Sequence, residues 1–178
     1  VSYCTYSSAS NTSPSFFHCS TTKSKSNPCI SNNKTKEGVL KQLITYGYLN
    51  EDTNPLTFAQ ITKLAKTLQI PDFKVLELDQ YKKLANKYKE PSNCIIYIPF
   101  ENDPNNGHYV SCFREQDGTL NYQDSFGTLN KFPLSDTNRI FRTNKVKYQS
   151  IFANNCGYLA LLHLFTHDAI DPLVQYNL

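Results

Sequence analysis

The chain has 178 residues, of which 39% are hydrophobic and 19% are charged, and its net charge is +3. This length supports one domain with a hydrophobic core, so we predict a single domain over residues 1–178. No apolar stretch approaches the roughly 20 residues that cross a bilayer, which excludes a transmembrane helix and predicts no membrane partner. The net charge is too small to indicate nucleic-acid binding by itself.

Residues 1–36 are rich in Ser, Thr, Asn and Lys and contain no acidic residue. This composition is typical of a flexible tail. Its apolar residues are expected to hold it against the domain: Tyr3, Tyr6, Phe16, Phe17 and Ile30. The role of the segment is left unassigned. Because the chain contains no methionine, we expect it to have been trimmed or cut from a precursor.

Six cysteines are spread along the chain, at positions 4, 19, 29, 94, 112 and 156. Burial alone can stabilise a chain of this size, so we expect free thiols rather than a disulfide framework. Cys4, His18, Cys19 and Cys29 have none of the short paired spacings of a zinc site. We therefore predict neither a metal nor another cofactor.

Three segments of the first half have apolar residues at helical spacing. Helices are predicted over 36–49 (KEGVLKQLITYGYL) and over 58–70 (FAQITKLAKTLQI), which Thr57 precedes and Pro71 ends. A weaker pattern over 79–88 (DQYKKLANKY) predicts a third helix.

The second half begins with short runs of β-branched and aromatic residues. Strands are predicted over 93–100 (NCIIYIPF), 108–115 (HYVSCFRE) and 120–126 (LNYQDSF), with a further possible strand over 145–152 (KVKYQSIF). Helices followed by strands and one more helix predict an α+β fold, with a small mixed sheet packed against helices.

The run CGYLALLHLF, from Cys156 to Phe165, is apolar around nearly its whole circumference and predicts a buried helix. Asn154 or Asn155 is suited to cap its first turn, so Cys156 falls at the helix N-terminus. Unpaired backbone N–H groups and the helix dipole favour a thiolate there. Most free cysteines are only small buried hydrophobes, so a nucleophile also requires a base.

His108 is the predicted base. His163 and His167 lie about 10 and 16 Å further along the same helix, too far from the sulfur, and His18 lies in the polar N-terminal segment. His108 begins a predicted strand after a loop, a place where catalytic groups are often displayed.

Asp124 is the predicted acid that orients His108. A two-residue turn at Asp117-Gly118 would point the two side chains to opposite faces of the sheet. We therefore predict a three-residue loop, Gln116 to Gly118, with Gly118 in the left-handed conformation and Val110 opposite Asp124. Asp117 is a turn residue in this interpretation. Two other loop carboxylates, Asp103 and Asp136, are weaker candidates for the acid.

The order His108, Asp124, Gln149 and Cys156-Gly157 resembles that of adenovirus protease (adenain) and its relatives in the Ulp1-like clan of cysteine proteases, which include virophage and Polinton-type enzymes. The matching motifs are CIIYIPF, GHYVSCF, YQDSFG and QSIFANNCG, within a stretch from about residue 73 to 165. Tyr109 stands where many relatives carry tryptophan.

The resemblance implies an adenain/Ulp1-like fold with the nucleophile on its central helix. It implies a cysteine endopeptidase with His108, Asp124, Gln149 and Cys156 as catalytic residues, Gln149 contributing its amide to the oxyanion hole. It also implies capsid or core precursors as substrates during virion maturation, a virion or infected-cell location in a reducing compartment, and possible activation by a peptide or DNA.

Two alternatives stay open from the sequence. The first is a protease specific for ubiquitin or a ubiquitin-like protein, which would share the same catalytic residues. The second is a non-catalytic structural or nucleic-acid-associated virion protein that uses the basic N-terminal segment, in which case Cys156 would be no more reactive than an ordinary thiol.

Overall fold

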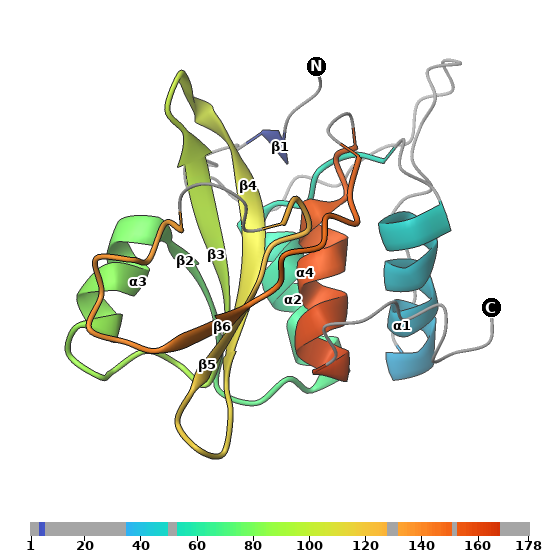
Figure 1. The fold of residues 1–178 in the computed structure, drawn as a ribbon. Coiled ribbons are helices and arrows are strands. Elements are labelled where there is room, and N and C mark those ends of the chain that lie inside the picture. Colours follow the sequence, from blue (N-terminus) through green and yellow to red (C-terminus); the bar gives the residue numbers. More distant parts are fainter. Residues whose placement is uncertain (1–3, 6–34, 50–52, 128–131, 151–152, 168–178) are drawn as a thin grey trace, which may run out of the picture.

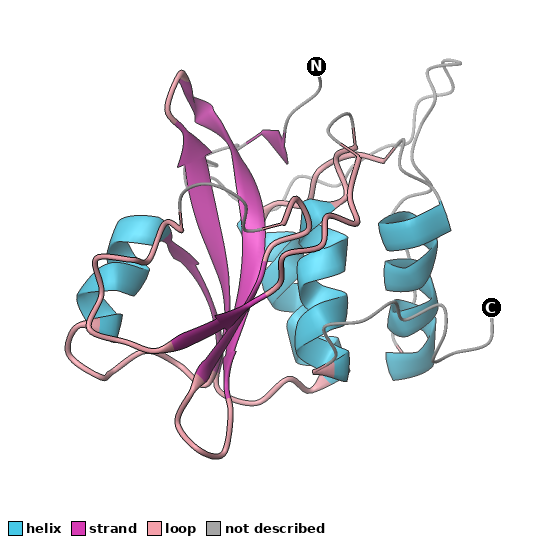
Figure 2. Cartoon of the chain, in the orientation of Figure 1, coloured by secondary structure: helices cyan, strands magenta, loops and turns pink. Residues whose placement is uncertain are grey.

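The architecture is α+β, as the sequence predicts. The computed structural model describes residues 4–5, 35–49, 53–127, 132–150 and 153–167. Within them, helices cover both faces of a mixed sheet (Figure 1). One face carries α3 (Leu78–Ala85), and the other carries α2 (Phe58–Leu68) and α4 (Cys156–Thr166), against which α1 (Lys36–Ile44) packs on the side away from the sheet (Figure 2).

The first two helices begin at threonine caps. Thr35 accepts a hydrogen bond from the N–H of Gly38 at the start of α1, which continues as a π-helical segment, η1 (Thr45–Leu49). Thr57 and Gln60 form a reciprocal capping box at the start of α2. The chain leaves α2 through Gln69, whose φ of 60° is left-handed. The helices predicted over 36–49, 58–70 and 79–88 are therefore confirmed, with ends shifted by a few residues.

The sheet has the strand order β2-β3-β4-β5-β6, and β1 pairs with β4 outside this path. Strands β3 and β4, and β4 and β5, are antiparallel, whereas β2 pairs in parallel with β3 and β6 pairs in parallel with β5. The strands are β1 (Cys4–Thr5), β2 (Phe73–Glu77), β3 (Asn93–Phe100), β4 (Asp103–Arg114), β5 (Leu120–Gln123) and β6 (Phe141–Thr143).

The hairpin between β4 and β5 has the predicted odd-length loop. The N–H of Glu115 donates to the carbonyl of Thr119 (2.8 Å), so residues 116–118 form the loop, and Gly118 has a φ of +84°. Ser111 pairs with Gln123 in the ladder. The same register sets Val110 opposite Asp124 one residue further on, which confirms the predicted alignment.

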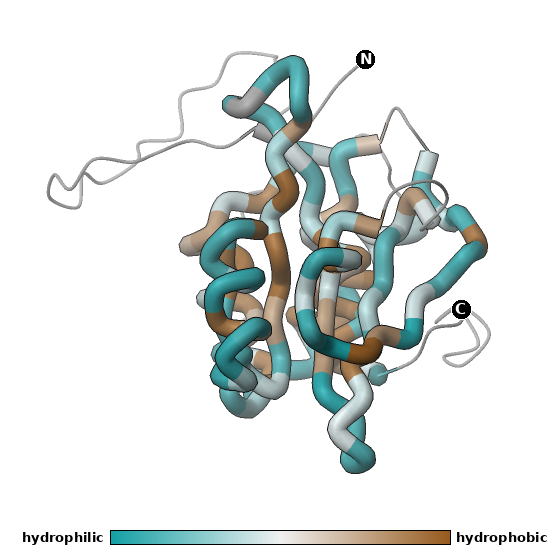
Figure 3. The backbone as a smooth tube through the Cα atoms, turned by 60° about the vertical axis from the view of Figure 1, so that its left-hand side comes forward, coloured by the Kyte–Doolittle hydropathy of each residue, from teal (hydrophilic) through white to brown (hydrophobic). Residues whose placement is uncertain are grey.

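Alternating residues of the central strands supply two separate cores. One set faces α1, α2 and α4 and comprises Ile95, Tyr97, Tyr109 and Phe113. The other packs with Tyr81 and Ala85 of α3 and comprises Cys94, Ile96, Val110 and Cys112. Figure 3 shows the hydrophobic residues of the central strands in brown, with α3 and the tip of the β4–β5 hairpin mostly hydrophilic and teal. A sheet with both faces covered explains why these strands are nearly continuously apolar.

Helix α4 is attached to β4 at three successive levels. At its first turn, a Cβ on Gly157 would lie 3.2 Å from Leu56 and 3.5 Å from Tyr109, so glycine permits a close approach. Further along, Ser111 and His163 share a buried hydrogen bond of 2.5 Å between Oγ and Nδ1. At the last level the rings of Phe113 and His167 stack at 4.3 Å. Residues 109, 111 and 113 of β4 therefore all face this helix.

Three strand predictions require correction. Residues 145–150 are irregular rather than a strand, because the N–H groups of Tyr148 and Gln149 both donate to one carbonyl, that of Ser125. The strand paired with β5 is instead β6, and residues 151–152 lie outside the described residues. Strand β4 begins at Asp103, so His108 lies within the strand rather than at its start. The strand predicted over 120–126 ends at Gln123, so Asp124 follows the strand instead of lying on it. Strands β1, β2 and β6 were not predicted.

Cys94, Cys112 and Cys156 are free, buried thiols. The other three cysteine side chains, and the apolar residues expected to anchor the N-terminal segment, lie outside the described residues. Across the described part of the chain, no helix has the length and hydrophobicity to span a membrane.

The buried, neutral imidazole of His163 leads us to predict that the free energy of unfolding falls in acid. Burial, with a smaller effect of His167, lowers the pKa of His163 to about 3, below the value of about 6.5 in an unfolded chain. The neutral ring therefore stabilises the fold fully above pH 6.5, and this contribution falls by up to about 1.4 kcal/mol per pH unit as the pH drops toward 3.

We expect His163→Gln to reduce the fall in the free energy of unfolding between pH 7 and pH 5, as measured by urea denaturation. Glutamine still offers Ser111 a hydrogen-bonding partner but does not take up a proton in this range. An unchanged pH dependence would contradict this prediction.

Candidate active site

The fold brings three of the predicted residues together from separate elements. His108 lies on β4, Asp124 directly follows β5, and Cys156 is the first residue of α4. The hairpin register places His108 and Asp124 on the same side of the sheet. The attachment of α4 to β4 brings the third residue to the histidine.

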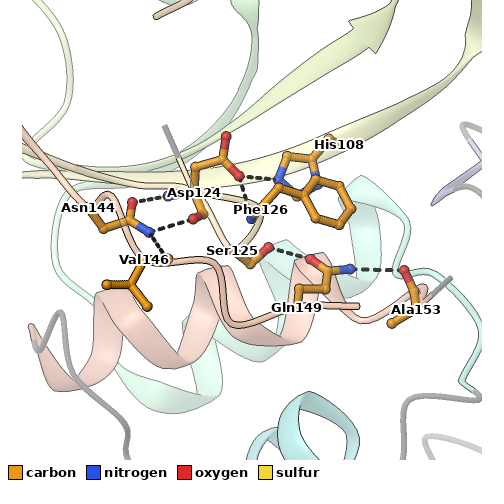
Figure 4. Close-up of polar contacts among 8 residues, drawn as sticks. All are labelled: His108, Asp124, Ser125, Phe126, Asn144, Val146, Gln149 and Ala153. Carbon is orange, nitrogen blue, oxygen red and sulfur yellow. Dashed lines mark hydrogen bonds and ion pairs between the residues drawn. The ribbon is translucent and has the colours of Figure 1, made fainter. Parts of the chain in front are cut away.

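His108 is oriented by Asp124 through a short hydrogen bond. Its Nε2 lies 2.8 Å from Oδ1 of Asp124, and the same carboxylate oxygen accepts the N–H of Phe126 at 2.8 Å (Figure 4). The ring of Phe126 stacks on the imidazole at 4.3 Å with an interplanar angle of 23°. This arrangement fixes both the position and the plane of the imidazole.

The proton affinity of His108 reflects both of its neighbours. Burial lowers the pKa of His108, but hydrogen bonds with Asp124 and Cys156, and the charges of these two groups, raise it to about 9. Since Nε2 faces Asp124, Nδ1 is the nitrogen available to the sulfur. At neutral pH the ring is therefore an imidazolium between a carboxylate and a cysteine.

Cys156 lies at the N-terminus of a buried helix, as predicted. The residue is fully buried, and so is nearly every other residue of α4 up to Leu164. The helix N-terminus and the adjacent imidazolium both favour a negative charge on the sulfur. Asn155 occupies the cap position, but its side chain makes no cap bond and donates to the carbonyl of Gly47 at 2.7 Å. Asn155, one of the two predicted candidates, therefore occupies the cap position but does not cap the helix through its side chain.

Gln149 is buried and held at both ends of its amide. Its Nε2 donates to the carbonyl of Ala153 at 2.9 Å, and its Oε1 accepts the hydroxyl of Ser125 (Figure 4). An amide nitrogen carries two hydrogens, and the bond to Ala153 uses one of them. Ala153 is three residues before Cys156, so Gln149 is connected to the chain that leads into α4.

Three residues that support this site were not predicted. The side chain of Asn144 accepts the N–H of Asp124 at 2.8 Å and donates to its carbonyl at 2.6 Å (Figure 4). Ser125 and Phe126 contact Gln149 and His108 as described above. The last two could have been suspected, because they follow Asp124 directly, but an asparagine 20 residues away gives no such signal.

The other candidate residues have different contacts. His163 bonds to Ser111, and His167 stacks on Phe113. Asp103 accepts the side-chain amide of Asn106, and Asp136 pairs with Lys82. Asp117 accepts the N–H of Thr119 within the hairpin loop, as expected for a turn residue. Among the described residues, no group of three or more histidine, cysteine and acidic side chains is arranged to hold a metal ion.

Comparison of the chain with protein-family models, with curated proteins and with solved structures finds no match.

The His108–Cys156 contact predicts a reactive thiol that depends on the imidazole. We expect iodoacetamide at pH 6.5 to alkylate Cys156 about tenfold more slowly in His108→Gln, because one pKa unit of charge interaction corresponds to a tenfold change in the thiolate. The site of modification would be read by mass spectrometry of peptides.

Cys94 serves as the internal control, since burial raises the pKa of its thiol and its alkylation should be slow in both proteins. Equal alkylation rates of Cys156 with and without the imidazole would contradict the prediction.

Proposed function

We propose that the chain is a cysteine endopeptidase of the adenain-like type, with Cys156 as nucleophile, His108 as general acid and base, and Asp124 as the acid that orients it. The observation that supports this most strongly is the position of His108. Its imidazole bonds to Asp124 through Nε2 and to the cysteine at the start of α4 on its other side. These are the relations that nucleophile, base and acid require for acyl transfer.

In the first half of the reaction, the Cys156 thiolate attacks the carbonyl carbon of a peptide bond. The C–N bond breaks, a thioester forms, and the imidazolium of His108 gives its proton to the departing amine. In the second half, water attacks the thioester while His108 takes a proton from it, the C–S bond breaks, and the carboxylic acid is released with the thiolate and imidazolium regenerated. Apart from the peptide and water, these two steps use only the side chains of Cys156 and His108.

Gln149 is proposed to stabilise the negative oxygen of the tetrahedral intermediates. The second hydrogen of its amide would donate to that oxygen, beside the backbone N–H of Cys156, as the resemblance implies. The burial of the amide supports this role, since hydrogen bonds are stronger away from water. Tyr109, in the position of the tryptophan of many relatives, packs beneath the first turn of α4 beside Gly157.

The substrate class and the setting are proposed on the resemblance alone. We propose capsid or core precursors as substrates during virion maturation, in the virion or infected cell, with a peptide or DNA as a possible activator. Cleavage of peptides from such precursors, compared with a ubiquitin-like fluorogenic conjugate, tests this assignment. Preference for the conjugate would instead favour a ubiquitin-like-specific protease.

Two substitutions separate the proposed roles by the size of their effect. Cys156→Ala should abolish cleavage of a peptide library, because it removes the nucleophile. Gln149→Glu keeps the size and the acceptor oxygen but lacks the N–H, and should lower kcat by about 10² to 10³, as loss of one oxyanion donor typically does. Similar mild losses in both variants would contradict these roles.

The raised pKa of His108 predicts different pH dependences for two reactions of Cys156. Peptide cleavage requires the imidazolium, so kcat/KM should fall as the pH rises through about 9. Alkylation by iodoacetamide requires no proton transfer to a leaving amine and should not fall over the same range. The two rates would be measured from pH 6 to pH 10.5, and cleavage that keeps rising above pH 9.5 would argue against His108 as the acid.

A further inference from the structure

Ser125 contacts Gln149 through both its side chain and its main chain. Its hydroxyl donates to Oε1 of Gln149, and its carbonyl accepts the N–H groups of Tyr148 and Gln149, each at 3.0 Å. Ser125 and Gln149 are both almost completely buried. Buried polar groups that satisfy each other hold a fixed geometry, because breaking the bond would leave both without water.

The oxygen and the nitrogen of the Gln149 amide have different hydrogen-bonding partners. The carbonyl of Ala153 can only accept, so it selects the orientation with Nε2 toward it. The hydroxyl of Ser125 then satisfies Oε1 and fixes where the amide lies. The remaining N–H of Gln149 is directed by these two bonds together.

The backbone around Gln149 does not position it by regular structure. Residues 144–150 and 153–155 are neither helix nor strand. A residue on irregular chain is positioned by its own hydrogen bonds rather than by a strand ladder or a helix. The bonds to Ser125 and Ala153 therefore largely determine where the Gln149 side chain lies.

The three-residue segment from Asp124 to Phe126, which includes Ser125, also contacts His108. Asp124, immediately before Ser125, accepts Nε2 of His108, and Phe126, immediately after it, stacks on that ring. Asn144 binds the main chain of Asp124 in both directions. Residues 124–126 therefore contact His108 on one side and Gln149 on the other.

We propose that Ser125 is a positioning residue for Gln149, whose hydroxyl holds the glutamine amide in the orientation that donates to the substrate's carbonyl oxygen. This inference rests on the proposed endopeptidase function and adds to it a residue that acts through Gln149 rather than on the substrate. It predicts that Ser125 matters only to a reaction that develops an oxyanion, and only while Gln149 is present.

Ser125→Ala tests this in the full chain. We expect kcat for peptide cleavage to fall about tenfold with little change in KM, a smaller loss than in Gln149→Ala. The alkylation rate of Cys156 by iodoacetamide should stay unchanged, because displacement of iodide forms no oxyanion. Ser125→Thr keeps a hydroxyl and should recover most of the activity.

Tyr81→Phe is the matched control. It also removes a buried hydroxyl, one that lies 3.4 Å from Sγ of Cys112 in the core on the α3 side of the sheet, and should leave kcat unchanged. A double variant completes the design, since Ser125→Ala should change kcat by less than twofold when Gln149 is already alanine.

Three outcomes would overturn this inference alone: an unchanged kcat in Ser125→Ala, an undiminished loss in the Gln149→Ala background, or a parallel loss of alkylation, which would mean that Ser125 acts through Asp124 and His108. A wild-type chain that cleaves no peptide would overturn the proposed function and this inference with it.

Discussion

The close packing of α4 against β4 is the constraint on which the site depends. The strand and the helix meet at Tyr109 and Gly157, again at Ser111 and His163, and again at Phe113 and His167. These contacts leave little freedom for the helix to slide along the strand. Since His108 belongs to this strand and Cys156 begins this helix, the packing that stabilises the core also sets the relative position of imidazole and sulfur.

A second level of organisation comes from the turn after β5. Helix α4 and strand β4 position Cys156 and His108, whereas Asp124 and Gln149 lie on irregular chain. Their places are determined by side-chain bonds from Asn144 and Ser125 and by the carbonyl of Ser125. Buried side-chain hydrogen bonds position this irregular chain, as backbone hydrogen bonds position the strands of the sheet. Removing one partner of such a bond leaves the other buried and unsatisfied, which is costly.

The sequence was most informative where structure is local. The alternation of side chains along each strand and the Asp117-Gly118 turn predicted the loop of residues 116–118. They also predicted that His108 and Asp124 share a face, because the length of this short loop sets the register of the hairpin. Capping and apolar spacing likewise predicted the start of α2 and the burial of α4.

Non-local bonds explain most of what the sequence did not predict. Asn155 looked like a helix cap, but its side chain bonds to Gly47, 108 residues earlier. Asn144 and Ser125 meet partners about 20 residues away through loops whose course no pattern specifies. The strand expected over 145–152 follows the β-branched and aromatic composition of that run, yet the chain there turns toward Ser125.

The narrow attachment of β6 has a consequence for how the molecule responds to heat. Only three residue pairs join β6 to β5, and Asn144, which holds Asp124, directly follows that short strand. Segments with few buried contacts open at lower free-energy cost than the core does. Detachment of this margin would release Asp124 while the helices and central strands remain folded, so loss of the His108–Asp124 contact and global melting would be separate events.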